Sequence, residues 1–272
     1  MIRKKTQYAI SIIAIIIGIV WINTIDNPSP KSITRDYPAI KESGILHAVT
    51  EYNTISYHVQ GNTIQGFDYE LLHAFSKEKK LKLEVTPEMS YEKRIEGVTK
   101  GKYDILATGT VITSPLKDSL LFTHTLLLSK QVLIQRKKKP ENDSTFIQNQ
   151  LDLANKKIYT IKGSPAVLRL HNLMNEIADT IYIEEIDMYG PEQLLAMVAG
   201  EDIDYAVCDL SIAQKLITDF PNLDIKLDIG FTQFYAWGVN KHAPALLDSL
   251  NEWLTRFQKT DEYKQLYKRY FN

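Results

Sequence analysis

Short apolar runs alternate with stretches of helical periodicity from residue 45 to the C-terminus. The pattern predicts a first series made of a strand at 45–49, a helix opened by Gly66, a strand at 81–85, a helix through 91–98 and a strand at 103–107. A second series has strands at 158–161, 181–183 and 205–207, with helices that begin at Pro165 and Pro191. The chain then returns to a strand at 235–239 and ends with helices at 243–258 and 261–271. This alternation predicts an α/β fold built from βαβ units with mostly parallel sheets.

The N-terminus departs from this pattern. Arg3, Lys4 and Lys5 precede the segment 8–25, which carries no charge. Its length is close to the roughly 20 residues that span a bilayer, and the basic flank is expected on the cytoplasmic side. We therefore expect residues 1–25 to form a basic flank and a membrane anchor, with the remainder facing the periplasm or the cell exterior. A cleaved signal peptide is the alternative, although no small-residue cleavage site follows the apolar run.

Residues 26–44 are polar and include three prolines, Pro28, Pro30 and Pro38. This composition is typical of an extended tether. We expect folding to begin at Ile45.

Composition excludes several classes of function. The chain has 32 Lys and Arg against 33 Asp and Glu, so no overall field favours nucleic acid. The single cysteine, Cys208, cannot form an intramolecular disulfide, and we expect its side chain to be buried in the core rather than to act as a nucleophile. The 6 histidines show no metal-ligand spacing, and no P-loop or nucleophile elbow is present. We expect neither a metal nor a cofactor, and specificity must come from a local site.

Five segments carry a resemblance to a known family. They are GFDYELLHAFSKEKKLKLEV, GKYDILATGTVITS, KKIYTIKGSPAV, GEDIDYAVCDLSIA, and FYAWGVNK with the ending TDEYKQLYKRYF. In this order and spacing they resemble the family-3 extracytoplasmic solute-binding proteins, typified by polar amino-acid receptors. The N-terminal domain of the F-type membrane-bound lytic transglycosylases looks similar too.

The resemblance implies a type II periplasmic-binding fold, in which two α/β lobes joined by two hinge strands enclose a ligand. Lobe 1 would comprise residues 45–133 and 236–272, and lobe 2 would comprise residues 134–235. The crossings are expected near 129–135 and 234–239.

The first lobe supplies four candidate site residues. Thr108, Gly109 and Thr110 are expected in a turn after a strand, where hydroxyls and backbone N–H groups can meet a ligand; a plain strand-end turn is the alternative. Tyr91 aligns with an aromatic residue that packs on the ligand side chain in the amino-acid receptors. Its alternative is core packing on its own helix.

The second lobe supplies three more. Gly163 and Ser164 are expected to present backbone N–H groups at a helix N-terminus, where anionic groups are favoured. Asp209 aligns with the carboxylate that holds an α-ammonium in the amino-acid receptors. An N-cap for the helix that follows is the competing role of Asp209.

The chain departs from the amino-acid receptors after Thr113. Where those receptors place an arginine that clamps the ligand α-carboxylate, this sequence has Leu116. Lys117 is adjacent and is kept as a candidate, although an ammonium does not reproduce the planar fork of a guanidinium. Asp209 without an arginine partner favours a cationic or amine-bearing ligand.

These observations predict a monomeric, non-enzymatic binding protein that captures a small polar solute, such as an amino acid, a peptide or an amine, for an ABC importer. The alternative is a sensor or binder of cell-wall fragments, and the third reading is a dehydratase that uses cleft carboxylates. A lytic transglycosylase needs a catalytic Glu in a separate domain. The only Glu-Ser pair, Glu42-Ser43, lies in the expected tether.

Overall fold

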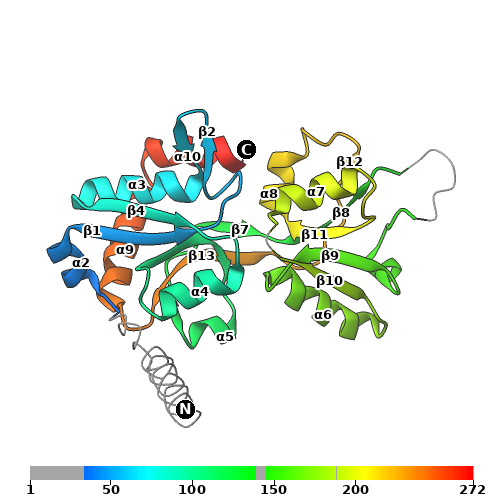
Figure 1. Cartoon of the computed structure of the whole chain (residues 1–272), viewed down its shortest axis with the longest axis horizontal. Coiled ribbons are helices and arrows are strands. Elements are labelled where there is room, and N and C mark those ends of the chain that lie inside the picture. The colour runs from blue at the N-terminus through cyan, green and yellow to red at the C-terminus, as the bar shows by residue number, and fades with distance from the viewer. Residues whose placement is uncertain (1–33, 139–144, 188, 272) are drawn as a thin grey trace, which may run out of the picture. The chain divides into compact units, whose positions relative to one another are not determined.

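The first lobe is built around a mixed sheet. The computed structural model describes residues 34–138, 145–187 and 189–271, and the predicted anchor at 1–25 lies outside them. The sheet has the strand order β4-β1-β5-β13-β6, and β7 also pairs with β13 (Figure 1). Its strands are β1 (Ile45–Thr50), β4 (Lys82–Pro87), β5 (Ile105–Val111), β6 (Leu120–Phe122), β7 (Leu127–Ser129) and β13 (Gln233–Asn240). β1 runs parallel to β4 and β5, whereas β13 runs antiparallel to its three neighbours.

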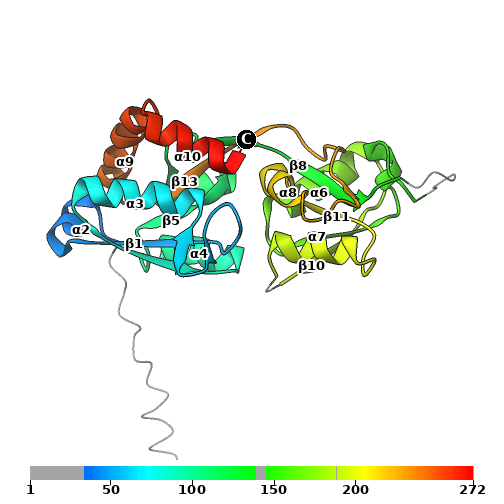
Figure 2. The same cartoon turned by 90° about the horizontal axis from the view of Figure 1, so that it is seen from above.

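Helices cover both faces of this sheet (Figure 2). One face carries α3 (Phe67–Lys79), α9 (Pro244–Phe257) and α10 (Asp261–Phe271), and the other carries α4 (Tyr91–Thr99). The predicted helix after Gly66 is confirmed as α3. The ring of Trp253 stacks on Phe257 with centroids 4.6 Å apart and meets Phe75 edge-on at 5.4 Å. These aromatic contacts hold the C-terminal helices on the first lobe, although they lie far along the chain from α3.

A short helix precedes β1 where the sequence predicted an extended tether. α2 (Tyr37–Ser43) has Asp36 as its N-cap, and Ile40 is fully buried. The Asp36 carboxylate also accepts the Leu246 N–H at 2.8 Å and so joins α2 to the start of α9. The prediction that folding begins at Ile45 is therefore wrong. A single buried isoleucine in a polar segment leaves too weak a periodic pattern to be recognised.

The second lobe is built around a separate sheet with the order β10-β9-β11-β8-β12. Its strands are β8 (Gln131–Arg136), β9 (Lys157–Ile161), β10 (Tyr182–Ile186), β11 (Ala206–Asp209) and β12 (Leu223–Asp224). The 3-10 helix η1 (Gln150–Leu153) and α6 (Pro165–Ile177) contribute to the core on one face, and α7 (Pro191–Ala199) and α8 (Leu210–Leu216) to that on the other. The two prolines that predicted helix starts occupy the first turns of α6 and α7.

Two stretches of chain join the sheets. One is the step from β7 to β8 at residue 130, and the other lies between β12 and β13. β8 pairs with β11 from Gln131 onward, and β13 pairs with β7 from Gln233 onward. The chain thus passes from one sheet to the other a few residues before the predicted lobe boundaries at 134 and 236. Strand propensity shows that a residue is in a strand, but it does not show which sheet the strand joins. No helix among residues 34–138, 145–187 and 189–271 is both long and apolar enough for a membrane span.

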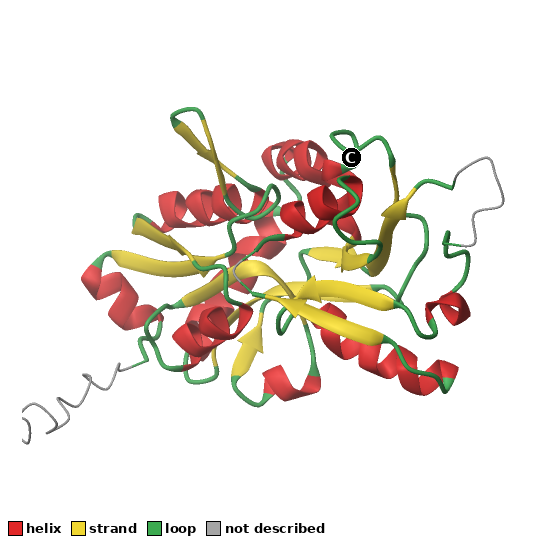
Figure 3. Cartoon of the chain, turned by 45° about the vertical axis from the view of Figure 1, so that its right-hand side comes forward, coloured by secondary structure: helices red, strands yellow, loops and turns green. Residues whose placement is uncertain are grey.

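A small hairpin stands out from the first lobe. It consists of β2 (His58–Gln60) and β3 (Thr63–Gln65), drawn in yellow above the helices in Figure 3. Gly66 then turns the chain into α3 with a φ of 136°. The Phe67 N–H donates to the Ile55 carbonyl at 2.6 Å, so the loop after β1 is fastened to the start of α3.

Gly66→Ala is expected to lower the free energy of unfolding by about 3 kcal/mol, because its backbone conformation is strained for any residue with a Cβ. An added Cβ would also lie 2.4 Å from the Ser56 carbonyl oxygen. Gly61→Ala is the matched control, since its φ is also positive but no atom lies within 4 Å of the added Cβ. That variant should cost about 1 kcal/mol. Urea unfolding of both variants measures the difference, and equal losses would contradict the steric account.

Candidate functional site

Two adjoining cavities lie between the lobes. Their volumes are about 60 and 80 Å³, and six residues line both: Glu51, Thr108, Gly109, Asp209, Ile212 and Tyr235. Glu51 follows β1 and Thr108 lies on β5 of the first lobe, whereas Asp209 ends β11 of the second. The shared lining makes the two cavities parts of one cleft with a wall from each lobe.

The first-lobe wall includes an irregular stretch of β5. β5 and β13 pair at Thr110 and again at Leu106, with a register shift between these positions. Thr108, Gly109 and Thr110 therefore lie within the strand, and the prediction that they form a turn after it is wrong. Thr108 and Thr110 are buried, and Gly109 is exposed. A run of small polar residues often marks the end of a strand, but here the strand continues through a bulge. Thr108 and Gly109 line both cavities, and Thr110 lines neither.

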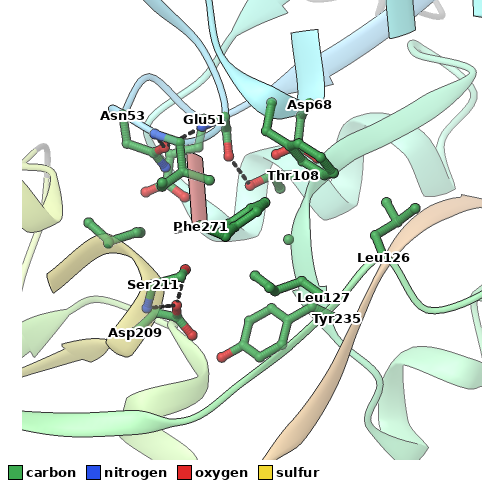
Figure 4. Close-up of a pocket in the computed structure, with 15 residues that line it drawn as sticks. Glu51, Asn53, Asp68, Thr108, Leu126, Leu127, Asp209, Ser211, Tyr235 and Phe271 are labelled. Carbon is green, nitrogen blue, oxygen red and sulfur yellow. Dashed lines mark hydrogen bonds between the residues drawn. The ribbon is translucent and has the colours of Figure 1, made fainter. Parts of the chain in front are cut away.

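Asp209 faces this wall from the second lobe (Figure 4). Its Oδ1 accepts the Ser129 hydroxyl at 2.8 Å and the Ser211 N–H at 2.8 Å, and the Ser211 hydroxyl is a third donor. Asp209 is also the N-cap of α8. The other carboxylate oxygen, Oδ2, is buried and forms no hydrogen bond of regular geometry. The Tyr235 phenol lies beside this carboxylate, and burial together with the carboxylate charge raises the pKa of Tyr235. One oxygen thus serves the fold, and the second can accept a donor from a ligand.

Tyr91 and Arg94 line the larger cavity from α4. The Arg94 guanidinium lies over the Tyr91 ring at 5.7 Å, and Arg94 is only 3% exposed. Its Nη2 donates to Glu51 Oε2 at 3.3 Å. Burial raises the pKa of the Tyr91 phenol, so this group stays neutral at physiological pH. Sequence reasoning missed Arg94 because a single arginine on an amphipathic helix is usually solvated.

The start of α6 differs from the prediction. Ser164 lines the larger cavity and is the N-cap of α6. The N–H of Gly163 donates to Glu185 Oε2 at 2.8 Å, and the N–H of Ser164 donates to the Ile161 carbonyl at 3.1 Å. Both donors are therefore engaged within the chain rather than presented to the cleft. The glutamate that captures the first of them lies on β10, and no local pattern identifies it.

Lys117 lies apart from the other candidates. It ends the short helix α5 (Ser114–Lys117), is exposed, and lines neither cavity. Lys117 therefore does not take the place of the missing arginine in the cleft. Among the described residues that line the cleft, Arg94 is the only one with a basic side chain.

A buried carboxyl group lies on the wall of the smaller cavity. Asp68 lies in the first turn of α3 and is 3% exposed. It accepts the Trp237 indole N–H at 2.6 Å. Burial raises its pKa from 3.8 to about 7, although the hydrogen bonds from Trp237 and Ser56 oppose that shift. Asp68 belongs to the GFD segment, but nothing in that segment shows that its aspartate faces a cleft.

Direct contacts hold the lobes together around the cleft. Glu192 on α7 accepts the Thr54 N–H of the first lobe at 2.8 Å, and Gln131 donates to the Tyr235 hydroxyl at 2.9 Å. Lys215 on α8 donates to the Arg269 carbonyl at 2.9 Å. These bonds fit the closed form of a clamp. Within the described ranges, no group of three or more His, Cys, Asp or Glu residues is placed to hold a metal ion.

The sequence pattern of the bacterial extracellular solute-binding proteins, family 3, matches residues 46–272. The chain belongs to this family. The predicted resemblance is confirmed, and the two-lobed fold agrees with it. Two solved structures of similar fold are a mutant of ArgBP from T. maritima and an ancestral arginine-binding protein bound to arginine. The first has a TM-score of 0.73 and 21% identity over 86% of this chain and 98% of its own. The second has a TM-score of 0.73 and 23% identity over 84% and 99%.

A third similar structure is AbpA from Streptococcus pneumoniae, an amino acid ABC transporter substrate-binding protein bound to L-arginine. It has a TM-score of 0.72 and 22% identity, over 86% of this chain and 97% of its own. Among curated proteins, this family-3 chain is 27% identical to the membrane-bound lytic murein transglycosylase F of Pseudomonas putida (strain GB-1) over 234 residues. The aligned part is 85% of this chain but 47% of that protein, so the chain spans about half the length of this relative.

Proposed function

We propose that this family-3 protein captures a small polar solute that carries a protonated amine, and that it does so without chemical turnover. The observation that supports the proposal most strongly is Asp209 Oδ2, a buried carboxylate oxygen without a partner on the wall of both cavities. An unpaired buried acceptor is costly, whereas an ammonium donor from a ligand would satisfy it.

The charges around the cleft favour the same class of solute. The carboxylates of Glu51 and Asp209 line both cavities, whereas Arg94 is the single described basic residue of the lining. Negatively charged walls attract cations and disfavour acidic solutes. The arginine bound by two similar proteins fits this chemistry, because it carries an ammonium and a guanidinium.

In this proposal the protein is the solute receptor of an ABC importer. The basic and apolar segment at 1–25 would hold the domain at the outer side of the membrane, and the closed clamp would deliver its solute to a permease as a monomer. We place the ligand against Tyr91, Thr108, Gly109, Ser164 and Asp209, and we leave out Thr110 and Lys117, which line neither cavity. Gly163 would not contact the ligand and would instead support the turn before α6, where its φ is positive.

Similarity to lytic murein transglycosylase F favours a second candidate, the recognition of cell-wall fragments. Amines occur in peptides of that kind as well as in free amino acids, so the same Asp209 oxygen would serve both. The two candidates differ in the size of solute that the cleft accepts.

A thermal-shift panel tests the proposal. It contains L-arginine, L-lysine, agmatine, spermidine, short peptides and muropeptides, with L-glutamate and L-aspartate as acidic solutes. At a concentration 100 times Kd, a ligand adds about 2.7 kcal/mol to the free energy of unfolding and raises Tm by several degrees. We expect such a rise only with amine-bearing solutes that are not acidic overall. A response confined to the two acidic amino acids would refute the proposal, and one confined to muropeptides would favour the second candidate.

A further inference from the structure

A groove of about 550 Å³ lies on the first lobe, away from the cleft. Its walls come from the β2–β3 hairpin, from α3 and from β4, which are neighbours in Figure 1. β4 is the edge strand of the first-lobe sheet. The volume falls within the range of roughly 300–1,000 Å³ that is typical of small-molecule sites. None of the residues that line this β4 groove lines either cavity of the cleft, so the two sites are separate.

One side of the β4 groove is apolar. Leu81 directly precedes β4, and Leu83 and Val85 lie on it, so the three side chains alternate onto the same face of the sheet. All three are only half-buried, and Ile64 of β3, which also lines the groove, is 39% exposed. An apolar ligand that covered these side chains would remove their surface from water and so gain free energy.

The α3 side of the β4 groove carries an unsatisfied polar group. Tyr69, His73, Ser76 and Lys77 line the groove at the spacing of one helix face. Ser76 is 2% exposed, and its hydroxyl is buried without a hydrogen-bond partner. A serine inside a helix often donates to the carbonyl four residues earlier, which this hydroxyl does not do. It is therefore a free donor for an acceptor on a ligand.

The charges of the lining indicate what kind of acceptor fits. Lys77 is exposed and forms no ion pair within the described part of the chain. No aspartate or glutamate of the described residues lines the groove, and the nearby Glu84 pairs with Lys82 at 2.7 Å. An ammonium and a free hydroxyl donor one residue apart favour a carboxylate over a cationic head group.

We propose that the β4 groove is a second binding site, and that its ligand is a monocarboxylic acid with an apolar aliphatic body. The carboxylate lies at Ser76 and Lys77, and the chain covers Leu83, Val85 and Ile64. This inference goes beyond the proposed function, because the site lies outside the cleft and takes a solute of the opposite charge.

Isothermal titration calorimetry with octanoate, kept below its micelle concentration, tests the proposal. We expect a single site. A fully buried CH₂ group strengthens binding about fourfold, so in this open groove octanoate should bind roughly twofold to fourfold more tightly than hexanoate for each added CH₂. Octanamide has the same chain without the negative charge and should bind about fivefold more weakly than octanoate.

Two variants assign the contacts to the head group. Ser76→Ala removes an unpaired hydroxyl, so it should weaken octanoate binding about fivefold without lowering the free energy of unfolding. Lys77→Glu reverses a charge on an exposed residue, so it should weaken octanoate binding about tenfold and leave octanamide binding within about twofold. Lys268→Glu is the matched control, because Lys268 is also an exposed lysine in the last turn of a helix but lies outside the groove.

The outcomes decide the proposal independently of the cleft. If the wild-type protein does not bind octanoate, or binds octanamide equally well, the carboxylate site is refuted without any variant having to fold. If Lys77→Glu and Lys268→Glu weaken octanoate binding equally, the acid binds through the overall charge of the protein and not in the β4 groove. Either failure leaves the amine-binding function of the cleft unaffected, since the amines of the thermal-shift panel test that function separately.

Discussion

Asp209→Asn should lower the affinity for the bound amine by about 2–5 kcal/mol while leaving thermal stability nearly unchanged. The asparagine side-chain oxygen still caps α8 and accepts from Ser129 and Ser211, because asparagine caps helices as well as aspartate does. The negative charge and the free acceptor at Oδ2 are lost, and the ligand ammonium would be buried without its counter-charge. Calorimetric titration with L-arginine measures the affinity, and a thermal melt without ligand measures the stability.

Two further variants make this result specific. Asp219→Asn makes the same chemical change on an exposed residue that lines neither cavity, and it should alter neither quantity. Asp209→Ala removes both roles, so it should lose affinity and also about 1 kcal/mol of stability through the missing cap. Unchanged affinity in Asp209→Asn would mean that Asp209 only caps α8.

Ionisation of Asp68 should lower the free energy of unfolding by on the order of 4 kcal/mol as the pH rises from 4 to 7. In the unfolded chain this carboxyl loses its proton near its ordinary pKa of 3.8, whereas burial raises the folded pKa to about 7. Between these values the folded state binds more protons than the unfolded state, so rising pH favours unfolding. Below pH 4 the contribution of Asp68 is fully present, and above pH 7 its loss is complete.

Asp68→Asn separates this contribution from that of the other titrating groups. The amide oxygen still accepts the Trp237 indole N–H, but the side chain no longer titrates. Urea unfolding at several pH values should therefore give a curve for the variant that falls less steeply than that of the wild-type protein. Parallel curves would show that Asp68 does not hold its proton in the folded state.

Local signals in the sequence predicted most of the elements. Pro165 and Pro191 lie in the first turns of α6 and α7, where a missing N–H costs nothing, and the apolar spacing of α3 marks its buried face. The two errors have a common cause. α2 buries little of its surface, and the end of β5 is a run of small polar residues that stays in the strand because Thr110 and Val111 pair with β13. In both places tertiary contacts outweigh local composition.

The candidate site was predicted less completely than the fold. Asp209 and the Thr108 to Thr110 segment were found because each follows an apolar run in the sequence, which predicted a strand end at the edge of a parallel sheet. Glu51, Asp68 and Arg94 were missed. Their side chains join the cleft only through the packing of the loop after β1 against α3 and α4, which no periodic pattern encodes. Whether a buried atom such as Arg94 Nε or Asp209 Oδ2 has a partner depends on the folded structure and not on any pattern in the sequence.

A crystal structure of this protein grown with the amine that gives the largest thermal shift tests the central claim most directly. The account predicts electron density for that solute between the lobes, with its ammonium within hydrogen-bond distance of Asp209 Oδ2. Density for the solute that lies elsewhere, or that places another part of the solute against Asp209, would contradict it.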